Sequence, residues 1–169
     1  MTIESLRDLF EFKLCCAYDC EQKLVKKGIP GMIKGASSPE LKSALQQHLE
    51  ETKMHVARLE KVFQTIGAEA ETEDDDIIDE MIDGAEDIIS DIDASPLRDA
   101  GLIVGGNAVE HYEMATYGSL VAFAQQLGFR DAASLLQQTL EEEKAADAKL
   151  TEIGESRINP LAAEEEKAA

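Results

Sequence analysis

Five acidic residues occupy positions where a helical core would normally hold leucine: Glu21, Glu110, Glu113, Glu143 and Asp147. Each lies near the middle of the apolar stripe that its neighbours form at helical spacing. A carboxylate without a partner is very unfavourable in an apolar interior, and it is tolerated when it is paired or bound to a metal ion. Several such carboxylates in one core therefore indicate a site for a pair of cations.

Two histidines and a further acid add candidates from another segment. His48 and His55 lie on the shoulder of the apolar stripe of residues 41–66, with Glu51 between them. The i, i+3 and i, i+4 spacings of a helix bring these three within reach of one another. A histidine in such a place can be a metal ligand or a structural side chain that hydrogen-bonds to acids, and the sequence leaves both readings open.

The expected turns place pairs of these acids at one height. Glu21 and Glu51 each lie fifteen residues from a turn near Ala36, and Glu113 and Glu143 each lie fifteen residues from a turn at Gly128. Antiparallel helices joined by such turns bring equidistant residues side by side. Each hairpin thus offers a pair of acids at mid-height, as a dinuclear carboxylate site in a four-helix bundle requires.

The elements that must position these residues are helices throughout. Apolar periodicity predicts helices over residues 3–27, 38–67, 71–93, 97–127 and 129–158. Ser38-Pro39 and Ser95-Pro96 are typical helix starts, and Gly67 and Gly128 are typical ends. Two long hairpins joined by a connection with its own helix predict an all-α fold, a ferritin-like four-helix bundle with an extra helix in the crossover.

The length of 169 residues fits one domain. We expect residues 1–158 to form the bundle, Asn159-Pro160 to end the last helix, and residues 159–169 to form an acidic, disordered tail. The segment 71–93 holds many acids and neither Lys nor Arg. We interpret it as a helix with a solvated acidic face, with calcium or partner binding as the alternatives.

The formal net charge of −19 makes nucleic acid and anionic membranes unfavourable partners. Cys15, Cys16 and Cys20 lie too close together on one helix for a disulfide framework, so we expect free thiols, with a redox role as the alternative. Together with the absence of a signal peptide or a long apolar run, free thiols predict a cytoplasmic protein.

Four segments that contain the candidate residues carry a family resemblance: AYDCEQKL, HLEETKMHVARLEKVF, VEHYEMATYGSL and TLEEEKAADAKLTEI. They resemble the YciE/YciF group of ferritin-like bacterial stress proteins over nearly the whole chain except the acidic tail. The resemblance implies a rubrerythrin-like four-helix core, a compact homodimer and a two-iron centre. It also implies induction under osmotic, salt or oxidative stress.

The chain departs from the common ferritin-like pattern of Glu-x-x-His on the second and fourth helices. Thr52 stands three residues before His55, and Glu143 is followed by Asp147 with no histidine. The ligand set is therefore more anionic, and two iron ions or manganese fit it. We expect Glu21 and Glu51 on one half of the site and Glu113 and Glu143 on the other. Glu110, Asp147 and His48 or His55 would complete it.

Two functions remain open at this point. The first is a stress-associated protein with a non-haem dinuclear carboxylate site that acts on peroxide or oxygen, as an oxidase or peroxidase, or that handles iron. The second is a non-enzymatic structural or interaction protein of the same fold. In that case the acids would share protons or pair with Lys13, Lys144 and the histidines, and the acidic connector would dock a partner.

Overall fold

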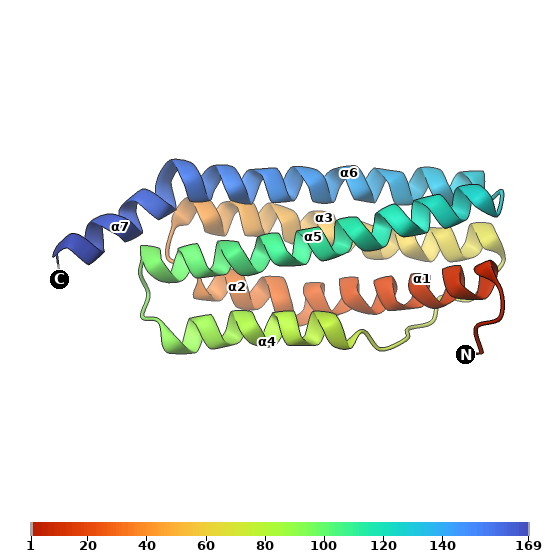
Figure 1. Cartoon of the computed structure of the whole chain (residues 1–169), viewed down its shortest axis with the longest axis horizontal. Helices are drawn as coiled ribbons and strands as arrows, with labels where there is room; N and C mark the ends of the chain where they lie inside the picture. Colours follow the sequence, from red (N-terminus) through yellow and green to blue (C-terminus); the bar gives the residue numbers. More distant parts are fainter. Residues whose placement is uncertain (1, 169) are drawn as a thin grey trace.

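A computed structural model describes residues 2–168, with side chains as far as Glu164, and shows an elongated bundle of helices (Figure 1). Its elements in chain order are α1 (Leu6–Lys23), the π-helical turn η1 (Leu24–Gly28), α2 (Ile29–Gly35), α3 (Pro39–Ile66), α4 (Asp76–Asp91), α5 (Pro96–Gln126), α6 (Arg130–Ile153), the π-helical turn η2 (Gly154–Ile158) and α7 (Asn159–Ala168). The predicted all-α ferritin-like bundle is confirmed, with α4 as the extra helix of the crossover.

The predicted helix boundaries at serine and glycine are confirmed. The hydroxyl of Ser38 accepts a hydrogen bond from the backbone of Leu41 at the start of α3, and Ser95 caps α5 in the same way. Gly67 and Gly128 have positive φ angles of 72° and 79°. Glycine adopts this conformation without the steric cost that a side chain would add, so the chain reverses there after α3 and α5.

Two prolines are passed by π-helical turns. Pro30 follows η1, whose last bond joins the Ile29 N–H to the Leu24 carbonyl, and Pro160 follows η2 in the same arrangement. A proline lacks an N–H and clashes with the carbonyl four residues before it. The wider i→i+5 turn relieves this clash and lets the helix continue.

The prediction that Asn159-Pro160 ends the last helix is therefore wrong, because α6 continues through η2 into α7. The first helix likewise runs on through η1 to Gly35. Figure 1 shows α7 leaving the end of the bundle. The prediction of a disordered acidic tail over residues 159–169 stays a prediction, and Ala169 lies outside the described residues.

The helices pack as two antiparallel hairpins with α4 on the outside (Figure 1). The α5–α6 hairpin packs against α3 through α6 and against α1 through α5. An added Cβ at Gly35 would lie 2.6 Å from the Ile89 side chain, and one at Gly101 would lie 2.9 Å from Ile88. These two glycines therefore let α4 approach α2 and α5 closely.

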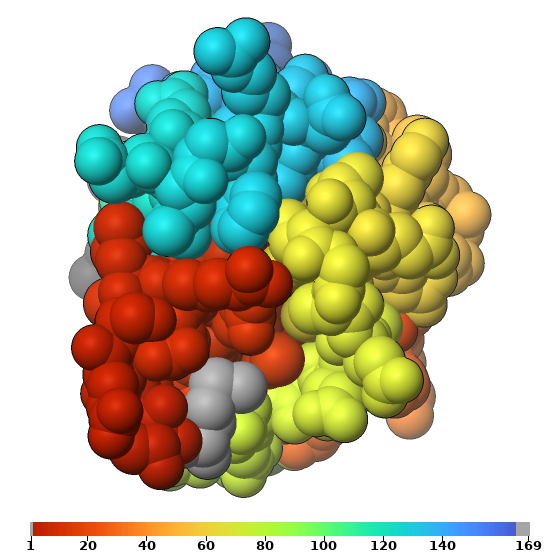
Figure 2. All heavy atoms as spheres, turned by 90° about the vertical axis from the view of Figure 1, so that its right-hand side faces the viewer, coloured from red at the N-terminus to blue at the C-terminus, as the bar shows by residue number. Residues whose placement is uncertain are grey.

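One end of the bundle gathers three segments that are distant in sequence. Figure 2 shows the start of α1, the α5–α6 turn and the chain after α3 side by side. The rings of Phe10 and Phe129 lie 5.9 Å apart there, and the Arg7 guanidinium lies 5.5 Å from the centre of the Phe129 ring. These contacts tie the first helix to the second hairpin.

The interior consists of two apolar clusters with a polar layer between them. Towards the end shown in Figure 2 lies a cluster that includes Phe10, Leu14, Leu59, Leu120 and Leu136. Towards the other end lies a cluster that includes Leu24, Leu41, Leu45, Leu102 and Leu150. Between these two sets lie buried acids and histidines of α1, α3, α5 and α6, namely Glu21, His48, His55, Glu110, Glu113 and Glu143. This polar layer is where the sequence predicted a metal site.

Cys15, Cys16 and Cys20 are free and buried, as the sequence predicted. Of the helices described between residues 2 and 168, none combines the length and the apolar character needed to cross a membrane.

Candidate metal centre

Three residues from three helices form the first group of donor atoms in the polar layer. Glu21 of α1, His55 of α3 and Glu143 of α6 have no solvent exposure. The Nδ1 atom of His55 lies 2.9 Å from the Glu143 Oε1 and 3.4 Å from the Glu21 Oε1. One ligand atom from each residue lies within 4.8 Å of the others, which is close enough for all three to bind one ion.

A second group shares one residue with the first. His48 of α3, Glu110 of α5 and Glu143 again offer ligand atoms within 4.8 Å of one another. The Nε2 atom of His48 lies 3.1 Å from the Glu110 Oε1. Because Glu143 belongs to both groups, its carboxylate stands where it could bridge two ions.

Several atoms of these two groups have no hydrogen-bond partner within the described part of the chain. They are the Oε2 atoms of Glu21 and Glu110, the Nδ1 atoms of His48 and His55, and both carboxylate oxygens of Glu143. Buried polar atoms are nearly always satisfied, and leaving them unsatisfied costs free energy. Carboxylate oxygens and imidazole nitrogens are ligands for iron and manganese, so the donor set fits a pair of such ions.

The orientation of His55 is fixed from the side away from these acids. Its Nε2 atom lies 2.9 Å from an oxygen of Glu142. Arg58 donates two hydrogen bonds to that carboxylate, at 2.8 and 3.1 Å, and a third to Thr139 at 2.6 Å. When the ring is neutral, an Nε2–H donated to Glu142 leaves the Nδ1 lone pair facing Glu21 and Glu143. A carboxylate behind a histidine is the usual support of a metal-binding imidazole.

Glu142 and Arg58 were not among the predicted site residues. The Glu142 side chain is 29% exposed and is engaged with both His55 and Arg58. The sequence gives only a weak signal for this pair, because Arg58 lies at the edge of its helix face, three residues after His55 and seven after Glu51. An arginine at a buried position requires an acceptor.

Glu113 of α5 is buried beside the two groups but is not part of either. The Cys20 thiol lies 3.9 Å from its Oε1 atom, at the limit of a sulfur hydrogen bond. On the same helix, Tyr117 donates a short hydrogen bond to the Oε1 atom of Glu21. Tyr117 therefore holds one oxygen of Glu21 and leaves the other for a ligand.

Glu51 and Asp147 lie at the edge of the layer. The Glu51 side chain is 35% exposed, and its Oε2 atom lies 3.9 Å from the Nδ1 of His48. Asp147 is 22% exposed, with an oxygen 3.2 Å from the Nε2 of His111. Neither belongs to the two buried groups. The predicted pairing of Glu21 with Glu51 is not observed, because His55, one turn further along α3, meets Glu21 instead.

Thr52 occupies the place of the missing acid on α3. It is buried, and its hydroxyl donates a hydrogen bond of 2.8 Å to the backbone carbonyl of His48. The hydroxyl is thus engaged with its own helix. The two imidazoles of α3 contribute the nitrogen atoms of the layer.

The buried charges shift one another's pKa values. Burial raises the pKa of Glu110 to about 7, although His48 beside it opposes this shift. Burial also raises the pKa of Glu21 and, together with the charge of Glu143, that of Glu113. Burial would lower the pKa of His55, but the carboxylates of Glu21 and Glu143 raise it to about 10. Without a metal, the layer therefore retains protons near neutral pH.

A third group of acids is already paired with a cation of the chain. Asp74, Asp76 and Asp79 lie close enough together for one ion. However, the Lys23 ammonium lies 2.7 Å from Asp74 and 2.6 Å from Asp79. Lys27 pairs with Asp83 at 3.0 Å further along α4. The acidic connector thus uses part of its charge to attach α4 to the first helix.

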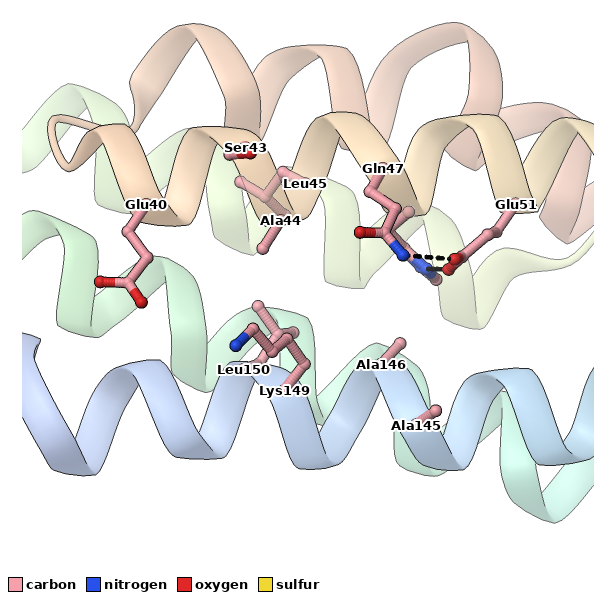
Figure 3. Close-up of a pocket in the computed structure, with 11 residues that line it drawn as sticks. Glu40, Ser43, Ala44, Leu45, Gln47, Glu51, Ala145, Ala146, Lys149 and Leu150 are labelled. Carbon is pink, nitrogen blue, oxygen red and sulfur yellow. Dashed lines mark hydrogen bonds and ion pairs between the residues drawn. The ribbon is translucent and has the colours of Figure 1, made fainter.

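A cleft of about 510 Å³ opens between α3 and α6 and reaches the polar layer (Figure 3). Its apolar lining comes from small and aliphatic side chains, namely Ala44, Leu45, Ala145, Ala146 and Leu150. His48 lines it as well, so one donor of the second group faces the cleft. Glu40 and Glu51 of α3 lie along one wall, and Lys149 of α6 lies on the opposite wall.

Comparison with known proteins identifies the family. The family described as "Domain of unknown function (DUF892)" matches residues 5–163. The chain belongs to the DUF892 family. Protein YciF of Escherichia coli (strain K12) is 35% identical over 163 residues, which cover 96% of this chain and 98% of YciF.

Solved structures agree with this assignment to the DUF892 family. The E. coli stress protein YciF superposes with a TM-score of 0.89 at 34% identity, covering 93% of this chain and 99% of that one. YcfI of Rhodopseudomonas palustris superposes with a TM-score of 0.85 at 37% identity, covering 88% of this chain and 94% of that one. The resemblance to the YciE/YciF group is thereby confirmed.

Proposed function

We propose that this DUF892 protein binds two iron ions, or alternatively two manganese ions, in its polar layer. The observation that carries the proposal is the pair of donor groups joined by Glu143, whose Oε1 atom lies 2.9 Å from the His55 Nδ1 and whose Oε2 atom has no hydrogen-bond partner among the described residues. Glu21 and His55 would hold one ion, His48 and Glu110 the other, and Glu143 both. Glu113 is placed to add a carboxylate.

The surroundings of the layer suit such a centre. Two ferrous ions there would supply two electrons for the reduction of peroxide or oxygen. Alternatively, the site would serve to store iron. Tyr117 and Glu142 orient two of the ligands, Glu21 and His55. The apolar clusters on either side lower the local dielectric constant, which strengthens the electrostatic interactions in the layer.

We place this activity in the response to stress, as the description of the relative YciF as a stress protein suggests. We also propose that the chain forms a homodimer. Leu97 and Val104 support this, because they lie one heptad apart on α5 and are 55% and 71% exposed. Sedimentation should then give twice the mass of 18.5 kDa, and a monomer would contradict this part of the proposal.

Metal titration tests the main proposal. Anaerobic addition of Fe²⁺ to the metal-free protein should give about two bound ions per chain, and a peroxide challenge should then oxidise them. Glu143→Gln should abolish binding of at least one ion, since both groups lose a charged donor. Glu141→Gln is the matched control, because Glu141 is exposed on the same helix and pairs with Lys144. No uptake, or equal uptake by Glu143→Gln, would contradict the proposal.

A structural protein without metal is the second candidate, and specific contacts favour it. His48 and His55 already pair with Glu110 and Glu143, and YcfI is described only as a candidate structural protein. The two lysines that were predicted to pair with the buried acids in such a protein are engaged elsewhere. Lys144 pairs with Glu141 at the surface, and Lys13 lies over the Phe12 ring. The titration separates the two candidates.

A further inference from the structure

The α3–α6 cleft reaches the imidazole of His48. His48 is only 9% exposed, yet it lines the cleft. Its Nε2 atom faces Glu110 in the polar layer, whereas its Nδ1 atom has no hydrogen bond to any described residue. The imidazole thus stands between the cleft and the layer, with its Nε2 atom beside Glu110 of the layer and its Nδ1 atom on the side of Glu51.

Glu51 stands on the outer side of that nitrogen. Its Oε2 atom lies 3.9 Å from the His48 Nδ1, and its Oε1 atom accepts a hydrogen bond of 2.9 Å from Gln47 (Figure 3). A carboxylate and an imidazole nitrogen at this separation are a pair of ligands for a divalent cation. Because Glu51 is partly exposed, an ion from solvent meets it before any buried donor.

The charge of the cleft favours cations. Glu40 lies at its far end and Glu51 beside His48. Lys149 faces them, but its ammonium is paired with Glu152 at 2.9 Å. The whole chain carries a net charge of −19, so divalent ions concentrate at its surface. The small side chains of Ala145 and Ala146 on the α6 wall leave the passage open.

Another hollow touches the layer from the opposite side but has no room for an ion. It is bounded by Cys20, Tyr112, Glu113 and Tyr117, and it contains no space for a water molecule. Of these two hollows, the α3–α6 cleft is therefore the one that both has volume and reaches a donor of the two groups.

We propose that metal ions enter the buried layer through the α3–α6 cleft and bind first to Glu51, which passes them to His48. This inference rests on the proposed metal-binding function and assigns Glu51 a role in entry and not in the final site. The entry step should therefore control the rate of loading without changing how much metal is bound.

Stopped-flow loading of the metal-free protein with Co²⁺ tests this, because cobalt gives visible absorption bands when it binds nitrogen and oxygen donors. Glu51→Gln should load roughly tenfold more slowly, since a carboxylate that concentrates cations can change association rates by this order. Glu50→Gln is the control, because Glu50 is an exposed neighbour outside the cleft. Ala146→Leu should narrow the passage and also slow loading, whereas Ala148→Leu on the exposed face of α6 should not.

The final spectrum and the number of bound ions should match the wild type in all four variants, and circular dichroism checks that each is folded. If Glu51→Gln and Ala146→Leu both load cobalt at the rate of the wild type, the entry route is overturned, and the proposed metal centre is unaffected. Loss of an ion in Glu51→Gln would make Glu51 a permanent ligand and would likewise overturn its role in entry. No cobalt or iron uptake by the wild type would overturn the proposed function itself.

Discussion

At the scale of single residues, His55 shows how this chain controls its polar layer. One imidazole nitrogen faces Glu21 and Glu143, and the other is held by Glu142, which Arg58 binds through two hydrogen bonds. Burial opposes ionisation of Glu142, but its bonds with Arg58 lower its pKa overall. Glu142 is therefore an anion that holds the His55 Nε2–H and, when the ring is neutral, keeps the proton on that nitrogen.

Glu142→Gln should weaken metal binding without removing a ligand. The amide cannot match the charge that orients His55, so the apparent affinity for Mn²⁺ should fall by roughly 10- to 100-fold, as for other outer carboxylates. Calorimetric titration measures this, with Glu141→Gln as the control on the same helix. An affinity equal to that of the wild type would show that the Glu142 contact does not support the site.

At the scale of elements, α4 is attached by close packing and by ion pairs. Ile88 and Ile89 occupy the space beside Gly101 and Gly35, where a Cβ atom would clash. Lys23 adds a charged contact to the start of the helix. The crossover helix thus covers α1, α2 and α5 although much of its outer surface is acidic.

Two glycine substitutions should therefore act in opposite directions. Gly35→Ala should destabilise the fold by about 1 to 3 kcal/mol, because the added methyl group would overpack against Ile89. Gly84→Ala should stabilise it by about 0.5 to 1 kcal/mol, because no atom lies near its Cβ position and alanine favours the helix. Urea unfolding followed by circular dichroism measures both. Equal effects would mean that α4 does not pack closely at Gly35.

At the scale of the whole molecule, the stability of the metal-free protein should fall as pH rises. The pKa of Glu110 rises from 4.5 to about 7 on folding, so the fold holds a proton that the unfolded chain has released between these values. The pKa of His55 rises from 6.5 to about 10, so its contribution is complete below 6.5 and is lost as pH approaches 10. Both groups act in the same direction.

Bound metal should reverse this trend. Deprotonated carboxylates and neutral imidazoles bind metal more tightly, so the loaded protein should become more stable as pH rises through the same range. The unfolding temperature, measured at several pH values with Mn²⁺ and with a chelator, compares the metal-loaded protein with the metal-free protein. Parallel pH curves with and without Mn²⁺ would contradict a metal centre, and a metal-free protein that gains stability with pH would contradict the buried-acid account.

The sequence by itself determined the fold. Helical periodicity, the Ser38-Pro39 and Ser95-Pro96 starts and the glycine ends gave the two hairpins and the crossover helix, because these signals are local. It also identified Glu21, Glu110, Glu113 and Glu143 as buried acids, since a helical wheel shows which face a residue occupies. The continuation of α6 past Pro160 could not be read locally, because a π-helical turn depends on how the helix packs.

Only the tertiary structure decided how the buried residues combine. In the structure, Glu143 lies close to two histidines of α3. Glu142 and Arg58 lie behind His55, and Glu51 lines a cleft. These relations depend on the relative height and rotation of α3 and α6. One helical turn of displacement between two helices exchanges one neighbour for another, and periodicity within each helix does not record that displacement.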